Sequence, residues 1–198
     1  GRVGANGLVV VSQGEAAILD SPWTNEQTEV LYRWIRDTMH LNVTAFIPNH
    51  WHNDCMGGIG YLLGKNVPVY ANNMTIDIAR KKGLPLPTKG FNDSLGLNLG
   101  ALELKCYYPG AAHSTDNIAI WIPAEKTLFA GCTVKELHSR NLGNTSDGDL
   151  TTYPQTLQYL LDTFKDVSTV IPGHGQPGGI ELVNHTMELA TQQSENRL

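Results

Sequence analysis

The stretch His50-Trp51-His52-Asn53-Asp54 places two imidazoles and one carboxylate at alternate positions of the chain. In an extended segment such residues share one face, because successive side chains point to opposite sides. The apolar run at residues 43–48 precedes them and predicts a buried strand that ends at proline. We therefore expect the cluster in a loop at the carboxyl end of a strand, where open α/β sheets carry their sites. Taken alone, the stretch fits a histidine-rich surface loop almost equally well.

Composition narrows the class of protein. The chain has 198 residues, of which 41% are hydrophobic, and this favours a single domain over residues 1–198. A net charge of −5 with scattered Lys and Arg argues against a nucleic-acid partner. No apolar run approaches the length of a membrane-spanning helix, so membrane insertion is not expected. The three cysteines are an odd number, which leaves at least one thiol outside any disulfide.

Strands and helices are expected to alternate along the chain. Apolar runs predict strands at residues 8–11, 16–19, 43–48, 67–70, 95–99, 102–107, 118–121, 127–130 and 169–172. Helices are expected at residues 24–40, 59–63, 72–82, 152–164 and 180–193. Thr24 and Thr152 are each followed three residues later by glutamine, which predicts two capping boxes. This order predicts sheets covered by helices, most economically an α/β four-layer αββα sandwich.

The first long helix has apolar residues at helical spacing. We expect that this set faces the core: Val30, Leu31, Trp34, Ile35 and Met39. The helix is expected to end near His40.

Three further candidates for metal binding stand beside predicted strands. His113 precedes a strand, Cys132 follows one, and His174 lies between two glycines after another. With the first cluster, they make one three-histidine set and one Asp-Cys-His set. Catalytic zinc sites have three protein ligands and keep a fourth position for water. Because thiolate and imidazole suit zinc better than magnesium or calcium, we expect two Zn²⁺ per chain.

The motif His50-x-His52-x-Asp54 with His113, Cys132 and Gly173-His174-Gly175 resembles the metallo-β-lactamase family, specifically its B1 subclass. The resemblance spans essentially the whole chain. It implies that His50, His52 and His113 bind one zinc, and that Asp54, Cys132 and His174 bind the other. In the B2 subclass Asn stands at the position of His50. In the B3 subclass His stands at the position of Cys55, and there is no cysteine at the position of Cys132.

The resemblance also implies an activity. It is hydrolysis of the β-lactam ring of penicillins, cephalosporins and carbapenems by a metal-bound hydroxide, which gives antibiotic resistance. Asp54 would orient the nucleophile, Asn144 would lie near the lactam carbonyl, and Lys135 would pair with the substrate carboxylate. A periplasmic monomer is expected. Family members have further N-terminal strands and a mobile flap ahead of the position of Gly1, so a trimmed or mature form is expected.

Two other functions stay open. One is another di-metal hydrolase of this fold, such as a glyoxalase II-like thioesterase or a phosphodiesterase. Those relatives usually have a bridging Asp where Cys132 stands and a His where Cys55 stands. The other is a non-catalytic zinc-binding module, although structural zinc sites normally have four protein ligands.

Some reactive side chains are expected to have structural roles. His40, His138 and His185 are interpreted as surface residues, and Cys106 as a small buried hydrophobe. Cys55 is expected beside the metal ligands and not among them.

Overall fold

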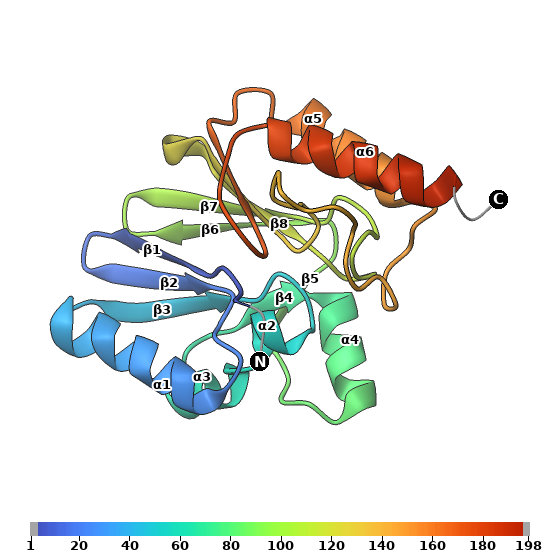
Figure 1. The fold of residues 1–198 in the computed structure, drawn as a ribbon. Helices are drawn as coiled ribbons and strands as arrows, with labels where there is room; N and C mark the ends of the chain where they lie inside the picture. Colours follow the sequence, from blue (N-terminus) through green and yellow to red (C-terminus); the bar gives the residue numbers. More distant parts are fainter. Residues whose placement is uncertain (1–3, 196–198) are drawn as a thin grey trace. The chain divides into compact units, whose positions relative to one another are not determined.

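The computed structural model describes residues 4–195, which belong to two compact units (Figure 1). The N-terminal unit comprises residues 7–105. The C-terminal unit comprises the residues from Cys106 onward together with the segment up to Asn6. Each unit has its own apolar core and is described by itself.

The strands of the N-terminal unit begin with a hairpin. β1 (Leu8–Ser12) pairs antiparallel with β2 (Glu15–Leu19), and β3 (Asn42–Ile47) pairs parallel with β2. The turn has positive φ at Gln13 (48°) and Gly14 (84°), which suits the tight loop of a hairpin. The strands predicted at residues 8–11 and 16–19 are thus confirmed, and they form a hairpin.

Four shorter or more polar strands complete this unit. β4 (Tyr70–Asn72) pairs parallel with β5 (Lys89–Phe91). β6 (Ser94–Leu99) neighbours β7 (Leu102–Tyr107), whose last two residues already belong to the C-terminal unit. The prediction missed β5 because three residues, one of them glycine, show no alternating pattern.

α1 (Asn25–Arg33) is capped as predicted, but its buried face differs from the prediction. The Gln27 backbone N–H donates to Thr24 Oγ1 at 3.3 Å. Val30 and Trp34 are 70% and 50% exposed, whereas Thr28, Tyr32 and Ile35 are buried. Since each residue turns the helix by about 100°, Val30 points away from the face that carries Thr28. A π-helical turn, η1 (Trp34–Thr38), ends the helix.

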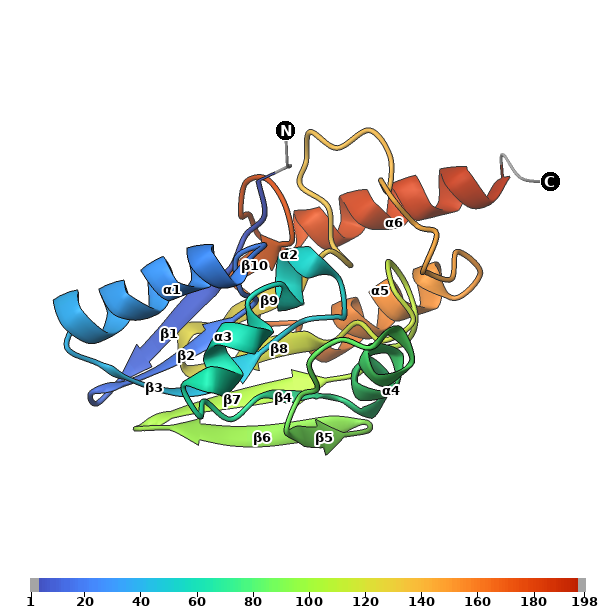
Figure 2. The ribbon, with the colours of Figure 1, turned by 90° about the horizontal axis from the view of Figure 1, so that it is seen from below.

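Three helices follow β3. They are α2 (Asn53–Met56), α3 (Ile59–Gly64) and α4 (Asn73–Lys82). Asn72 Oδ1 accepts from the Met74 N–H at 2.9 Å, and Gly83 ends α4 with φ 67°. The helix predicted at residues 72–82 is therefore confirmed, with Asn72 as its cap and Gly83 after its last residue. The core of this unit packs Tyr32 and Ile35 against Ile18 and Phe46, with α1 lying along the strands (Figure 2).

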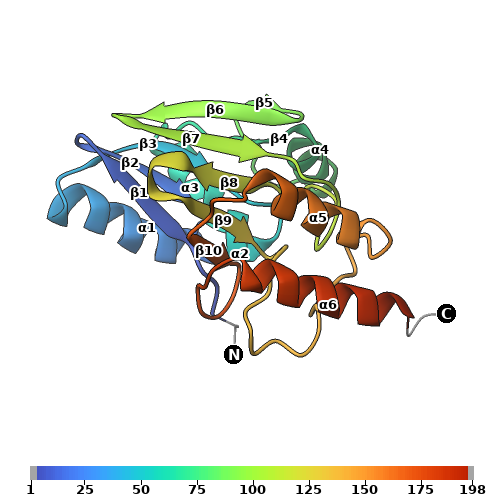
Figure 3. The ribbon, with the colours of Figure 1, turned by 90° about the horizontal axis from the view of Figure 1, so that it is seen from above.

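The C-terminal unit contains β8 (Ala119–Ile122), β9 (Thr127–Gly131) and β10 (Thr169–Pro172). β8 and β9 are antiparallel, joined by the 3-10 turn η2 (Pro123–Glu125), and β10 is parallel to β9. α5 (Tyr153–Thr163) and α6 (Glu181–Glu195) lie side by side (Figure 3). Their core residues include Leu157, Leu160 and Leu182, packed with Trp121.

The second predicted capping box is wrong. Thr152 already has helical φ and ψ (−91°, −11°), and its side chain makes no capping bond. Its hydroxyl instead donates to the Ala111 carbonyl at 3.0 Å. The hydroxyl of Thr152 therefore makes a tertiary hydrogen bond in place of the predicted capping bond.

No helix in the described part of the chain is both long and apolar enough to cross a membrane.

Candidate metal centre

The histidine motif lies at the start of α2, directly after β3. His52 is the N-cap residue of α2, with extended φ and ψ (−66°, 159°), and Asp54 lies within the helical turn. We expected all three side chains in one extended loop, and the structure corrects this for Asp54. The prediction that the motif follows a strand end is confirmed, because only the segment 48–52 separates β3 from α2.

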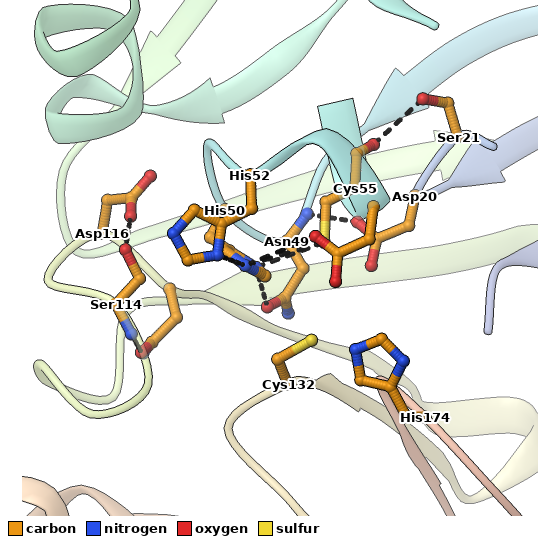
Figure 4. Close-up of polar contacts among 12 residues, drawn as sticks. Asp20, Ser21, Asn49, His50, His52, Cys55, Ser114, Asp116, Cys132 and His174 are labelled. Carbon is orange, nitrogen blue, oxygen red and sulfur yellow. Dashed lines mark hydrogen bonds and ion pairs between the residues drawn. The ribbon is translucent and has the colours of Figure 1, made fainter. Parts of the chain in front are cut away.

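The two motif histidines face each other through specific nitrogens (Figure 4). His50 Nε2 is 2.9 Å from His52 Nδ1 and 4.0 Å from Asp54 Oδ1. On the opposite side of its ring, His50 Nδ1 lies 3.3 Å from Asn49 Oδ1. A proton on Nδ1 donated to that amide oxygen leaves the Nε2 lone pair for a metal, since a neutral imidazole has one donor and one acceptor nitrogen.

Asp20 and Ser21 hold this loop in place, and the sequence interpretation missed both. The Asn49 N–H donates to the buried carboxylate of Asp20 at 2.5 Å. Ser21 Oγ donates to the Cys55 carbonyl at 3.1 Å and accepts from the Gly58 N–H at 2.8 Å. Asp20 has φ 56°, an uncommon conformation for a residue with a side chain. The sequence signal was an acidic residue directly after the apolar run at residues 16–19.

The glycines after the motif are required by close packing. A Cβ on Gly57 would collide with the Trp23 carbonyl oxygen, and one on Gly58 with the Thr28 side chain. Any larger residue would therefore displace α2 from α1.

Cys55 lies behind His50. Its side chain is 1% exposed, and its sulfur is 3.2 Å from His50 Nδ1, the nitrogen on the side away from His52. This position agrees with the expectation that Cys55 is a neighbour of the ligands.

In the C-terminal unit, His113 is buried in a loop tied to the start of α5. The Asp149 N–H donates to the Ala112 carbonyl at 2.9 Å, and Thr156 Oγ1 donates to the Ala111 carbonyl at 2.7 Å. A Cβ on Gly148 would collide with the Ala112 carbonyl oxygen. Ser114 Oγ donates to Asp116 Oδ1 at 2.5 Å within the same loop (Figure 4). The loop is thus fixed on both sides of His113.

Cys132 and His174 follow β9 and β10 and point toward each other (Figure 4). Gly173 packs directly on Cys132, since a Cβ at Gly173 would lie 2.6 Å from the Cys132 backbone nitrogen. His174 Nδ1 is 2.7 Å from the Gly4 carbonyl oxygen. A carbonyl oxygen only accepts, so Nδ1 carries the proton and Nε2 is left to bind a metal.

Asn6 fixes the same loop, although no pattern in the sequence indicates this role. Its side-chain amide donates to the carbonyls of Pro172 and Gly175 at 2.8 and 2.9 Å. Its backbone N–H donates to the Gly173 carbonyl at 2.8 Å. A short polar residue before a strand has many uses, so only the fold identifies this one.

Lys135 and Asn144 differ in how firmly they are held. Lys135 Nζ donates to the Cys132 carbonyl at 2.7 Å, and its backbone N–H donates to Thr186 Oγ1 at 2.8 Å. Asn144 is exposed, and its Oδ1 accepts from the Ser146 N–H at 3.1 Å. That bond leaves the amide nitrogen as the end of Asn144 that can donate.

Tyr153 supports the segment after Cys132. Its hydroxyl is fully buried and donates to the Thr133 carbonyl at 2.8 Å. Burial, and secondarily the charge of Cys132, raises the pKa of Tyr153, so the phenol stays protonated and keeps donating.

The remaining candidates have the expected structural roles with one correction. His40 and His138 are exposed, and burial raises the pKa of the Cys106 thiol to about 12. His185 is not a plain surface residue, because it is partly buried and its Nε2 lies 2.9 Å from the Ser139 carbonyl oxygen.

The described residues include groups of His, Cys and Asp that could hold a metal ion. All six predicted ligands occur in these groups: His50, His52, Asp54, His113, Cys132 and His174. Imidazole, thiolate and carboxylate are the ligands that zinc takes in proteins. The donor chemistry of the chain therefore fits zinc.

Comparison with known proteins identifies the family of this chain. The profile of the Metallo-beta-lactamase superfamily matches residues 1–174. The chain is 48% identical to "Metallo-beta-lactamase type 2" of Bacteroides fragilis, covering 99% of this chain and 79% of that one. It is 30% identical to the protein of the same name from Pseudomonas aeruginosa, over 96% and 75% of the two chains.

Solved structures that are similar to this chain support the same family. The metallo-β-lactamase from Pontibacter korlensis has a TM-score of 0.93 and 34% identity, over 96% of this chain and 88% of that one. TMB-1 also has a TM-score of 0.93, with 37% identity over 97% and 87% of the two chains. The predicted α/β fold is therefore confirmed as the fold of these proteins.

Proposed function

Because the chain belongs to the metallo-β-lactamase superfamily, we propose that it opens β-lactam rings with two zinc ions held by the six predicted ligands. It is a hydrolase that acts on the β-lactam ring, as its relation to enzymes named metallo-β-lactamase supports. The family expected from the sequence is thus confirmed, and the relatives support its B1 subclass.

His50, His52 and His113 would bind one zinc, and Asp54, Cys132 and His174 the other. The imidazole, thiolate and carboxylate groups of both sets have the donor chemistry that zinc takes in proteins. Cys55 is not assigned as a ligand, because its sulfur faces the Nδ1 side of His50. The observation that carries the proposal is that His50 and His174 each have Nδ1 next to a protein oxygen, which leaves Nε2 for metal.

Bound zinc would polarise the lactam carbonyl and lower the pKa of water from 15.7 to about 7. Hydrolysis adds one water across the C–N bond of the ring and yields a carboxylate and an amine. Asp54, 8% exposed in the first turn of α2, would accept a hydrogen bond from the attacking water and orient it toward the carbonyl carbon.

Lys135 would bind the substrate carboxylate. Its ammonium donates to the carbonyl of Cys132, the residue that follows β9. The charge of Lys135 therefore lies beside a residue that we propose as a metal ligand. An ammonium group can form a charge-assisted hydrogen bond with a carboxylate, and such a contact would fix the orientation of the substrate.

Asn144 would assist at the carbonyl. Its Oδ1 accepts from Ser146, so the side chain is oriented with Nδ2 as the outward donor. A donor aimed at a developing oxyanion stabilises the transition state more than the ground state.

The substrate range and setting also belong to the proposal. We expect penicillins, cephalosporins and carbapenems to be hydrolysed, because Lys135 recognises a carboxylate that all three classes carry. We expect a periplasmic monomer.

The direct test is turnover of a carbapenem by the purified protein, with and without a chelator. We expect hydrolysis that the chelator abolishes and that added zinc restores. Hydrolysis that survives complete removal of metal would contradict the proposal, as would turnover of a thioester or phosphodiester with no turnover of any β-lactam.

A further inference from the structure

Trp51 stands between the two motif histidines, and its ring contacts two neighbours. The indole lies edge-on to the His52 imidazole, with ring centroids 4.5 Å apart and an interplanar angle of 72°. On the same indole, the Lys82 ammonium is 4.0 Å from the ring centroid. The Trp51 indole therefore contacts both a cation and the imidazole of a proposed zinc ligand within the N-terminal unit.

α4 presents Lys82 at a fixed place. Lys82 is the last residue of this helix, and the helix ends in the two-bond motif that glycine permits. The Gly83 N–H donates to the Arg80 carbonyl at 3.2 Å, and the Leu84 N–H donates to the Ala79 carbonyl at 2.9 Å. The backbone of Lys82 is therefore ordered, and only its side chain has to be held by Trp51.

The two histidines of the motif differ in how their rings are supported. His50 is fully buried and packed between Asn49 and Cys55. His52 is only partly buried, and its ring makes edge contacts with both His50 and Trp51. The orientation of His52 thus depends on Trp51 more than the orientation of His50 does.

We infer that Lys82 is a positioning residue that acts through Trp51 to hold the His52 imidazole in its metal-binding orientation. A cation over an exposed indole face stabilises the pair modestly, which suits fine control of one ring. The inference rests on the proposed zinc site of the previous section.

The direction in which zinc affinity changes distinguishes a positioning role of Lys82 from simple electrostatic repulsion. A lysine near a site for a divalent cation repels that cation, so removing its charge should tighten zinc binding slightly. If Lys82 instead positions His52, removing its charge should weaken zinc binding. Lys81 is the matched control, because it is the adjacent exposed lysine of the same helix end and contacts no aromatic ring in the part of the chain that the structure describes.

The experiment compares wild type with Lys82→Met, Lys82→Arg, Lys81→Met, Trp51→Leu and the double variant Lys82→Met/Trp51→Leu. Zinc affinity is measured by competition with a chromophoric chelator. The imidazole ¹⁵N resonances of His50 and His52 are recorded in the metal-free proteins. This second readout does not depend on activity or on bound metal.

We expect Lys82→Met to weaken zinc binding about two- to fivefold. Lys82→Arg should bind within about twofold of wild type, since a guanidinium also stacks on indole. Lys81→Met should show no loss. Within the Trp51→Leu background, Lys82→Met should cause no further loss, because the indole that couples Lys82 to His52 is gone. The His52 resonances should shift in Lys82→Met while those of His50 do not.

Three results would overturn the inference: equal or tighter zinc binding by Lys82→Met, equal losses for Lys82→Met and Lys81→Met, or no rescue by arginine. A wild-type chain that binds no zinc would instead contradict the proposed function. In that case unchanged His52 resonances in metal-free Lys82→Met would still overturn the positioning role, and shifted ones would support it.

Discussion

The two units supply equal numbers of the proposed metal ligands, but they do so from different local structures. The N-terminal unit provides His50, His52 and Asp54 from five consecutive residues at the start of one helical turn. The C-terminal unit provides His113, Cys132 and His174 from three separate loops. The first set depends on one local conformation, whereas the second depends on contacts between segments far apart in the chain.

The hydrogen bonds that anchor the loops also differ between the two units. In the N-terminal unit, the side chains of Asp20 and Ser21 anchor a single loop through hydrogen bonds to the backbone of Asn49, Cys55 and Gly58. In the C-terminal unit each loop has its own anchor, from Asn6 under His174 to Asp149 beside His113. We therefore expect single substitutions in the C-terminal unit to disturb one ligand at a time.

The largest expected effect separates Cys132 from Cys55. Cys132→Ser removes a thiolate ligand and should lower kcat by more than about 100-fold, since losing only an outer partner of a metal site costs 10–100-fold. Cys55→Ser should be much milder, because its sulfur faces the Nδ1 side of His50. Zinc content and β-lactam turnover of both variants test this. Equal zinc loss in the two would show that Cys55 is a ligand.

The second largest effect is expected from a change in the packing of Gly173 on Cys132. Gly173→Ala places a methyl group against the Cys132 backbone, so we expect a loss of about 1–3 kcal/mol in unfolding free energy and weaker zinc binding. Gly64→Ala is the matched control, because a Cβ there meets nothing within 4 Å. It should be neutral or stabilise by up to about 1 kcal/mol. Denaturant unfolding would contradict the structure if both variants behaved alike.

Lys135 should show a smaller effect that concerns substrate alone. Lys135→Ala removes a charged contact of roughly 1.5–3 kcal/mol, so kcat/KM should fall about 10- to 100-fold or slightly more. The loss should appear in KM with kcat nearly unchanged, if the contact is equal in the ground and transition states.

The control for Lys135 is a β-lactam with an esterified carboxylate. It should lose little further in the variant, because its charged partner is already absent. Equal losses for the free acid and the ester would mean that Lys135 acts only through its bond to the Cys132 carbonyl.

The smallest effect should come from Asp149, which caps the segment beside the His113 loop. Backbone hydrogen bonds from Thr151 and Thr152 lower the pKa of Asp149 below its ordinary value of 3.8. A carboxyl group with a lowered folded-state pKa stabilises the fold above its unfolded pKa, and this stabilisation disappears as the pH falls through the folded-state value. Asp149→Ala should therefore lower Tm at neutral pH in the metal-free protein. The difference from wild type should shrink below pH 3.8, and a difference independent of pH would contradict the capping role.

Much of the fold could be predicted because its signals are local. The hairpin at Gln13-Gly14 and the helix between Asn72 and Gly83 each have turn or capping residues at the required positions. The buried face of α1 could not be predicted, because Val30 and Trp34 have the apolar spacing but lie on the solvent side. Thr152 was misinterpreted because its hydroxyl bonds to Ala111, a residue 41 positions away.

The proposed metal ligands could also be predicted only where the signal is local. The motif at residues 50–54 identifies itself by spacing, and the other three ligands were found as reactive residues beside strands. Their anchors could not be found in this way. Asn6 and His174 are 168 positions apart, and nothing in the local sequence of either one indicates the other.

The number of zinc ions bound per chain tests the central claim most directly. Elemental analysis of the zinc-saturated protein should give two zinc ions for wild type and one for Cys132→Ser, because the three-histidine set does not use the thiolate. A single tightly held metal in the saturated wild type, or stoichiometric iron in place of zinc, would contradict two zinc sites built from three ligands each.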